Sequence, residues 1–287
     1  MPVELSYVQT IVLGVLEGLT EFLPVSSTGH LTVAEKLMGL RVDAPAVTAY
    51  TAIIQIGAIA ATFIYFSRKI ARLLTAWVAG LRDAAAREHE DYTLATAVVV
   101  GSVPLGIVGF LFRDLISGGL RSLWVVAAAL ILWSAVIWVA ERRHDVLEEQ
   151  GIQRGASEVT VRDGLVIGLV QSFALIPGIS RSGATISAGL MRGIDRVTAT
   201  ELSFFMAIPA LTAAGLYQLV SEFDGVVALG VGPVLVGIAV SFATAYAAIA
   251  WLLRFVATNS LRPFIWYRLA LGTLIIVALS AGWITAR

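Results

Sequence analysis

Two polar stretches interrupt an otherwise apolar sequence, and both carry side chains that can act on an anionic group. The first is EFLPVSSTGH at 21–30, and the second is PGISRSGAT at 177–185. Carboxylates, hydroxyls and an imidazole gather in or just before the first stretch, whereas the second offers an arginine among hydroxyls. The first set suits acid–base or nucleophilic chemistry, and the second suits the binding of an anion.

Glu17 and Glu21 are four residues apart, so on a helix they share one face. Ionisable groups in a membrane segment are costly and are functional candidates by default. Two such carboxylates can hold a divalent cation, Mg²⁺ or Ca²⁺, or they can share a proton. A solvated helix end near the outer interface is the alternative interpretation.

The serines after Pro24 predict the start of a new half-helix. Free N–H groups and the hydroxyls of Ser26 and Ser27 would favour a phosphate there, although plain N-capping accounts for them equally well. His30 lies in the same apolar segment, beside these hydroxyls. A general base or nucleophile is the favoured role for His30, and a hydrogen-bonded structural histidine is the alternative.

Arg181 has no acidic neighbour in the sequence, and its guanidinium fork matches phosphate oxygens. Hydroxyl donors surround it and extend the predicted phosphate-binding set to Ser26, Ser180, Ser182 and Thr185. The alternative is a structural ion pair with an acidic residue of another membrane segment, which would be Glu17, Glu21 or Glu201.

The composition predicts an all-α integral membrane protein with a single domain over 1–287. Hydrophobic residues make up 58% of the chain and charged residues 14%, against about 25% charged in soluble domains. The formal net charge is zero, which gives no indication of nucleic-acid binding. The absence of cysteine excludes disulfides and thiol catalysis.

Six segments read as membrane spans, and two more are interrupted in the middle by Pro, Gly and Ser. The interrupted stretches, 8–38 and 163–191, predict two re-entrant helix pairs. The spans are expected at about 48–66, 93–112, 122–140, 201–221, 233–253 and 264–284.

The basic residues test this topology, because cytoplasmic loops carry an excess of them. With loop 67–92 inside, thirteen basic residues fall inside and five outside, the latter being Lys36, Arg41, Arg113, Arg121 and Arg287. Arg181 and Arg268 fall within membrane segments. Both termini are then outside, and the two re-entrant pairs enter from opposite sides.

The two halves also resemble each other at an offset of 154 residues. Glu17 then matches Gln171 and Ser26 matches Ser180, with Gly14 and Gly29 matching two further glycines, Gly168 and Gly183. This predicts an inverted repeat, with one half over about 1–140 and the other over about 160–287. In such proteins the broken helices meet near the midplane and form the site. Chance similarity between short apolar segments is the alternative.

Longer motifs resemble the undecaprenyl-pyrophosphate phosphatase family, also called the bacitracin-resistance proteins. The two signatures are LEGLTEFLPVSSTGHL at 16–31 and PGISRSGATIS at 177–187. The resemblance continues through YTAIIQIGAIAA at 50–61 and ELSFFMAIPA at 201–210, so it covers nearly the whole chain.

The resemblance implies hydrolysis of undecaprenyl diphosphate to undecaprenyl phosphate and inorganic phosphate, which recycles the lipid carrier for peptidoglycan synthesis. It also implies bacitracin resistance, stimulation by a divalent cation and a multi-pass protein of the bacterial plasma membrane. The family's active residues map onto Glu17, Glu21, Ser27, His30, Ser180, Arg181 and Thr185.

Two chemical routes stay open at this point: Ser27 attacks phosphorus with His30 as its base, or His30 activates a water. The predicted topology places 21–30, and hence catalysis, on the outer side. A flippase that uses the same site without breaking a bond is the alternative function. A phosphatidate-phosphatase type of site would need a second histidine after Arg181, and the chain has none there. A homodimer is compatible with helical membrane packing, although no motif demands one.

Overall fold

The computed structural model describes residues 5–40, 42, 44–113, 115–120, 122–221 and 229–286. Within these ranges the chain is helical and forms no strand, apart from one isolated bridge between Arg154 and Ile194. The all-α prediction is therefore confirmed. Three of the basic residues assigned to the outer side lie outside the described residues, namely Arg41, Arg121 and Arg287.

Six helices are long and apolar enough to cross a bilayer, which confirms the six predicted spans. They are α3 (Pro45–Tyr65), α5 (Glu90–Leu111), α6 (Leu123–Glu149), α9 (Arg196–Ser221), α11 (Val231–Val256) and α12 (Arg262–Ser280).

Two boundaries differ from the sequence prediction by five residues or more. Helix α6 continues beyond residue 140 to Glu149, and α9 begins at Arg196 instead of 201. The reason is an ion pair between the two extensions, in which Arg196 Nη2 lies 2.8 Å from the buried Glu141 carboxylate. A prediction from hydropathy ends each span at the first charged residues. Because these charged residues neutralise each other, both helices continue through them.

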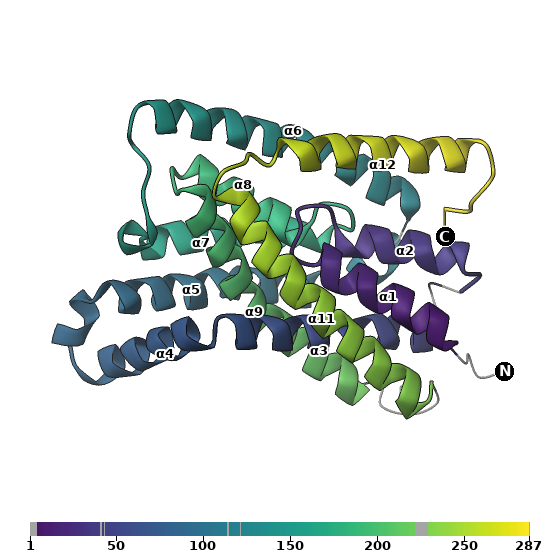
Figure 1. Cartoon of the computed structure of the whole chain (residues 1–287), viewed down its shortest axis with the longest axis horizontal. Coiled ribbons are helices and arrows are strands. Elements are labelled where there is room, and N and C mark those ends of the chain that lie inside the picture. The colour runs from purple at the N-terminus through teal and green to yellow at the C-terminus, as the bar shows by residue number, and fades with distance from the viewer. Residues whose placement is uncertain are drawn as a thin grey trace.

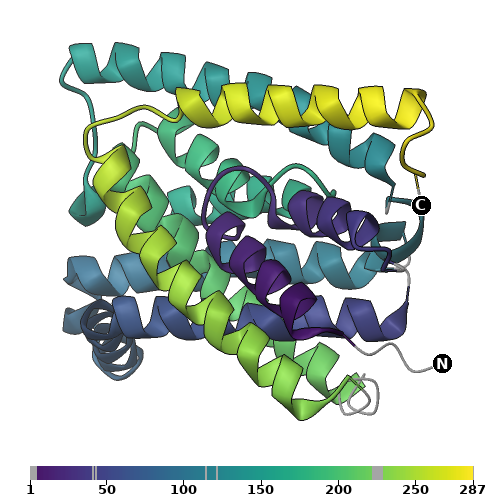
Figure 2. The same ribbon diagram turned by 45° about the vertical axis from the view of Figure 1, so that its right-hand side comes forward.

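Four shorter helices lie between the long ones (Figure 1). They are α1 (Tyr7–Thr20), α2 (Ser27–Leu37), α7 (Val161–Gln171) and α8 (Arg181–Met191). Each has 11 to 14 residues, too few to cross a bilayer. Both views place these helices between α6 and α12 on one side and α3 and α5 on the other, and α11 runs diagonally beside α1 (Figures 1 and 2).

The two interruptions predicted from the sequence are real breaks between these short helices. The first break, residues 21–26, separates α1 from α2. The second break, residues 172–180, separates α7 from α8 and contains a short 3₁₀ helix, Ser172–Leu175. The re-entrant path through a bilayer and the inverted repeat stay predictions.

The segment 67–92, expected as a loop, is partly helical. Helix α4 (Ser67–Arg82) packs Leu73 inward and places its Gly80 against the ring of Tyr92. Apolar residues on one side and arginines on the other give an amphipathic helix, which a search for apolar runs does not detect. Figure 2 shows α4 nearly end-on while α6 and α12 run across the picture.

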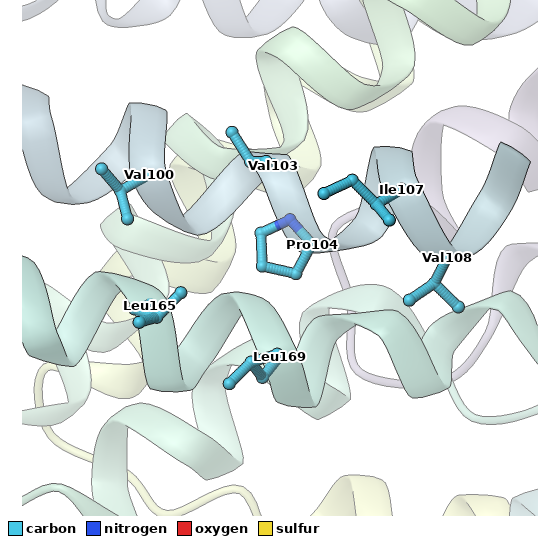
Figure 3. Close-up of a pocket in the computed structure, with 7 residues that line it drawn as sticks. All are labelled: Val100, Val103, Pro104, Ile107, Val108, Leu165 and Leu169. Carbon is cyan, nitrogen blue, oxygen red and sulfur yellow. The ribbon is translucent and has the colours of Figure 1, made fainter. Parts of the chain in front are cut away.

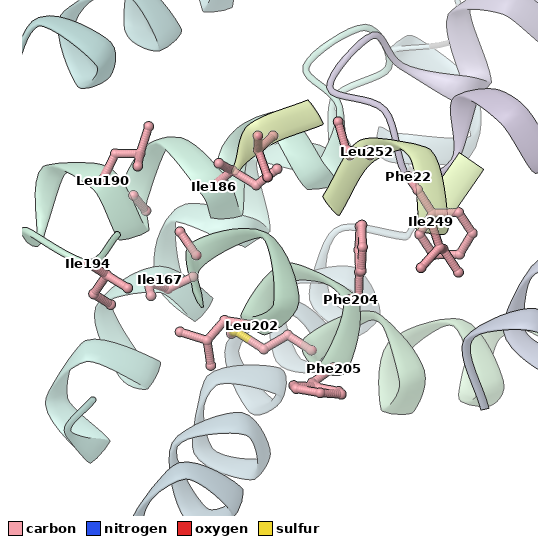
Figure 4. Close-up of a cluster of buried hydrophobic side chains, with 14 of the residues drawn as sticks. Phe22, Ile167, Ile186, Leu190, Ile194, Leu202, Phe204, Phe205, Ile249 and Leu252 are labelled. Atoms are coloured by element: carbon pink, nitrogen blue, oxygen red, sulfur yellow. The ribbon is translucent and has the colours of Figure 1, made fainter. Parts of the chain in front are cut away.

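A buried apolar cluster joins the first break, α7 and α8 to the long helices (Figure 4). Phe22 of the first break packs edge-to-face on Phe204 of α9, with ring centroids 5.1 Å apart. Ile186 of α8 and Ile249 of α11 belong to the same cluster. Within lipid such contacts act through close packing, since lipid tails are as apolar as the side chains. The cluster therefore fixes the first break against α9.

Close backbone contact sets the position of α7. A Cβ added at Gly168 would lie 2.0 Å from the carbonyl oxygen of Gly101 on α5. No side chain fits between these helices, so glycine at this crossing lets α7 lie directly on α5. The second break, which begins directly after α7, takes its position from this crossing.

Candidate active site

Each break ends at a serine with strained backbone geometry. Ser26 and Ser180 have φ values of 75° and 76°, and they are the only non-glycine residues with positive φ in the described part of the chain. Each is the N-cap of the next helix, and its Oγ accepts a hydrogen bond from Gly29 or Gly183 at 3.3 and 3.2 Å. Backbone strain of this kind costs about 1–3 kcal/mol and clusters at functional sites.

One carboxylate joins the two breaks. Ser27 Oγ donates to Glu21 Oε2 at 2.7 Å, and Arg181 Nη2 donates to Glu21 Oε1 at 3.2 Å. The Glu21 and Arg181 side chains are only 6% and 9% exposed, so water screens this ion pair little. The structure thus brings three predicted site residues into one cluster. Arg181 forms an ion pair with Glu21, which is one of the acidic partners that the alternative interpretation of Arg181 named.

Arg181 keeps donors for a further anion. Its Nη1 donates to the carbonyl of Ser203 on α9 at 2.7 Å, and Nε and Nη2 both point to Glu21. A guanidinium carries five N–H groups. Among the described residues no protein acceptor takes the other two, which are therefore available to phosphate oxygens.

His30 bonds to groups other than Ser27. Its Nδ1 lies 2.7 Å from the carbonyl oxygen of Ser26, and its Nε2 lies 2.6 Å from the Tyr267 hydroxyl. A carbonyl only accepts, so Nδ1 carries the hydrogen, and Nε2 of the neutral ring accepts from Tyr267. In this structure the partner of the Ser27 hydroxyl is thus Glu21, which differs from the expected pairing of Ser27 with His30.

Glu17 is fully buried. The Gln55 side chain lies near its carboxylate, but neither oxygen has a partner at full hydrogen-bond geometry among the described residues. The side chain of Gln171, the predicted counterpart of Glu17 in the second half, likewise has no hydrogen-bond partner among these residues. An isolated buried carboxylate is too costly to remain charged and alone. Glu17 therefore fits a bound cation or a proton, whereas both Glu21 oxygens already bond to Ser27 and Arg181.

The hydroxyls of the second break bond to protein. Ser182 Oγ donates to the carbonyl of Leu23 in the first break at 2.9 Å and lies 3.1 Å from Ser180 Oγ. Thr185 Oγ1 donates to the carbonyl of Arg181 at 2.9 Å. These contacts hold the two breaks side by side and orient the start of α8. Phosphate binding by these hydroxyls stays a prediction.

Sequence reasoning missed two site neighbours on α12. Tyr267 contacts His30, with the two rings stacked at a centroid distance of 5.6 Å. Arg268 is fully buried behind the two breaks. The signal for Arg268 was present, because a charged residue in a membrane segment is a functional candidate. Nothing in the local sequence marks Tyr267.

A separate groove of about 350 Å³ lies between α5 and α7 (Figure 3). It is lined by Pro104, Leu165, Leu169 and four branched aliphatic residues of α5. None of the site residues reaches it, and it has no polar side chain to hold a phosphate. Its lining suits a lipid chain, so we place the chemistry at the breaks and not in this groove.

Comparison with known proteins finds similarity over nearly the whole chain. The family profile described as bacitracin resistance protein BacA matches residues 10–274. A Frankia casuarinae protein named undecaprenyl-diphosphatase 3 is 53% identical, covering 98% of this chain and all of its own. Undecaprenyl-diphosphatases of Cutibacterium acnes and Acidothermus cellulolyticus are 49% and 50% identical, covering 98% and 97% of this chain and 100% and 99% of their own. The similarity therefore includes both breaks and α12.

Proposed function

The chain belongs to the family of the bacitracin resistance protein BacA, and from this we propose that Glu21, Ser27 and Arg181 form its active centre. It is an enzyme that hydrolyses undecaprenyl diphosphate to undecaprenyl phosphate and inorganic phosphate, the reaction named for its relatives. One observation carries the assignment of residues: a single buried carboxylate holds both a serine hydroxyl and a guanidinium. The product undecaprenyl phosphate is a lipid carrier for cell-wall synthesis. Removal of undecaprenyl diphosphate accounts for bacitracin resistance.

In the first step Ser27 Oγ attacks the terminal phosphorus and passes its proton to Glu21 Oε2. The bond from phosphorus to the bridging oxygen breaks, and undecaprenyl phosphate leaves. Arg181 holds the terminal phosphate with its two remaining N–H groups, and the N-terminus of α8 adds backbone donors. Charge that develops on the phosphate is stabilised because these donors are already in place.

In the second step water cleaves the bond between Ser27 Oγ and phosphorus. Glu21 returns its proton to Ser27, and the proton lost by the water goes to His30 Nε2, the ring nitrogen without a hydrogen, once the Tyr267 hydroxyl has turned away from it. The other route from the sequence has His30 activate a water that attacks the diphosphate directly. The two routes differ in whether Ser27 is covalently modified.

Glu17 would hold a divalent cation, Mg²⁺ or Ca²⁺, and Glu21 would join it through an oxygen lone pair that Ser27 and Arg181 do not use. When bound, the ion would neutralise part of the diphosphate charge. Support comes from the buried carboxylate of Glu17, whose oxygens have no ion-pair partner and no hydrogen bond of full geometry among the described residues. Removal of cations with a chelator should abolish phosphate release, and added Mg²⁺ or Ca²⁺ should restore it. Unchanged release in a chelator would refute the cation.

The helices make this a multi-pass membrane protein, and we place it in the bacterial plasma membrane with its site facing outward. The chain has no cysteine, so single cysteines can be labelled without background. A membrane-impermeant maleimide applied to whole cells should label Ala281→Cys and spare Ala84→Cys, which are both exposed positions. The reverse labelling would invert the topology.

Helical packing also admits a homodimer, which the mass of the purified protein in detergent would reveal.

The deciding experiment measures phosphate release from undecaprenyl diphosphate by purified protein, beside Ser27→Ala, His30→Ala and Arg181→Ala. Cation-dependent release that Ser27→Ala and Arg181→Ala both abolish would support the serine route. If Ser27→Ala keeps near-normal turnover while His30→Ala loses it, the water route replaces it. No release from folded wild-type protein would reopen the flippase alternative, which no observation on this structure favours.

A further inference from the structure

Arg268 is an arginine with no exposed surface in the middle of a membrane helix. Within the described part of the chain, its hydrogen bonds all go to uncharged groups, and none of them goes to a carboxylate. Burying an unpaired guanidinium costs several kcal/mol even after the protein adapts to it. A side chain retained at that cost needs a role that an apolar residue could not fill.

The acceptors of Arg268 come from three separate parts of the chain. Nη1 donates to the carbonyl of Pro24 at 3.1 Å, and Nη2 donates to the carbonyl of Gly178 at 3.0 Å. The remaining bonds go to α6, from Nη2 to the carbonyl of Ala129 at 3.4 Å and from Nε to Ser134 Oγ at 3.3 Å. One guanidinium thus connects the first break, the second break and a long helix.

The two break carbonyls lie next to the residues of the active centre in the sequence. Pro24 stands three residues from both Glu21 and Ser27, and Gly178 stands three residues before Arg181. The breaks themselves have few regular backbone hydrogen bonds, because a helix ends and another begins there. A small movement of either carbonyl would therefore change the position of the Ser27 hydroxyl relative to the Arg181 guanidinium.

Gly178 shows how closely the second break is seated on α6. Its φ is 101°, and an added Cβ would lie 2.4 Å from the carbonyl oxygen of Val126. Glycine permits both the backbone angle and the contact. The Gly178 carbonyl accepts from Arg268 Nη2, which also donates to the carbonyl of Ala129, one turn further along α6 from Val126.

We propose that Arg268 is a positioning residue for the phosphatase reaction. Its guanidinium fixes the position of the first break relative to the second. The planar fork suits this task because its N–H groups are fixed relative to one another and can reach two carbonyls at once. A lysine would carry the charge as a single point without that fixed spacing. The inference rests on the proposed active centre, because Arg268 would act by fixing the distance between Ser27 and Arg181.

The test compares Arg268→Met and Arg268→Lys with Arg254→Met, a matched loss of an exposed arginine from α11. Hydrogen exchange followed by mass spectrometry reports each break separately and needs no activity. Arg268→Met should raise exchange in peptides 21–30 and 177–185 by about tenfold, the equivalent of one lost hydrogen bond, and leave α11 unchanged. Turnover should fall roughly 100-fold, as expected for a misplacement of about 1 Å, with a smaller change in KM.

Arg268→Lys should lie between wild type and Arg268→Met in both readouts, and Arg254→Met should match wild type. Three results would overturn the proposal: unchanged exchange in both breaks, increased exchange throughout the chain, or looser breaks with normal turnover. An inactive wild-type protein would refute the active centre instead, while the exchange data would still report on the contacts of Arg268.

Discussion

At the scale of single residues, the central feature is the use of one carboxylate for two purposes. Glu21 accepts from Ser27 with one oxygen and from Arg181 with the other. An acceptor beside the hydroxyl can take its proton, and the guanidinium beside that carboxylate holds it in place. The proton acceptor for Ser27 and the orientation of the phosphate-binding Arg181 thus depend on the same side chain.

Glu21→Gln tests this dependence. The amide keeps the shape of the carboxylate but cannot take a proton, so kcat should fall by roughly 10²–10⁴-fold, the usual contribution of a general base. The measurement is phosphate release by purified protein, with the exposed Glu88→Gln as a control. Turnover close to that of wild type would exclude Glu21 as the proton acceptor.

Tyr267 is the other residue-scale feature, because its hydroxyl fixes the His30 ring from the side opposite Ser26. Tyr267→Phe keeps the stacked ring and removes one hydrogen bond, worth about 1 kcal/mol. We expect kcat/KM to fall about fivefold as the ring loses its orientation. Tyr246→Phe on α11 controls for loss of a tyrosine hydroxyl, and equal values for both variants would leave Tyr267 without a role.

At the scale of elements, the site depends on where the short helices stop. Each break ends at a serine with positive φ that caps the next helix, so Ser27 and Arg181 both occupy the first position of a helix. Free backbone N–H groups at such positions favour an anion. The position of α7 on α5 then decides how far the second break reaches toward the first.

Gly168→Ala tests that crossing. Its Cβ would lie 2.0 Å from the carbonyl of Gly101, so α7 must move away from α5, at about 1–3 kcal/mol for an overpacked contact. The unfolding temperature in detergent should fall and phosphate release should fall with it. Gly106→Ala on α5 is the matched control, since nothing lies within 4 Å of its added Cβ. A stable and active Gly168→Ala protein would contradict the role of this crossing.

At the scale of the whole molecule, a charged cluster ties the start of α7 to the segment after α6 and to the end of α8. Asp163 at the start of α7 has no exposed surface and accepts hydrogen bonds from Arg154, Arg192 and Thr160. Burial alone would raise the pKa of Asp163, but these donors outweigh burial and hold the pKa below its usual range. The group therefore stabilises the fold while it is charged.

The pH dependence follows from the sign of that shift. A lowered pKa in the folded state gives stability that is present above the unfolded value and is lost as pH falls below about 4. Asp163→Asn should lower the unfolding temperature by about 10 °C near neutral pH, as for a broken buried pair, and should make the stability depend less on pH in acid. The exposed Asp83→Asn is the control, and an identical acid limb in wild type and Asp163→Asn would refute the assignment.

Much of this protein was determined by its sequence alone. Six apolar runs predict six spans because a bilayer core fixes the length of a crossing helix. Polar residues inside such runs mark the two breaks, because lipid cannot satisfy them. For that reason Glu21, Ser27 and Arg181 were candidates before any of their contacts was known.

Only the tertiary structure decided which of these candidates meet. Local sequence cannot say that Ser27 bonds to Glu21 instead of His30, because a turn between two helices sets the direction of each side chain. It also cannot reveal that Arg268 and Tyr267, about 240 residues from the first break, lie against it. Composition and period limit which elements form, whereas contacts between distant residues depend on how all the helices pack together.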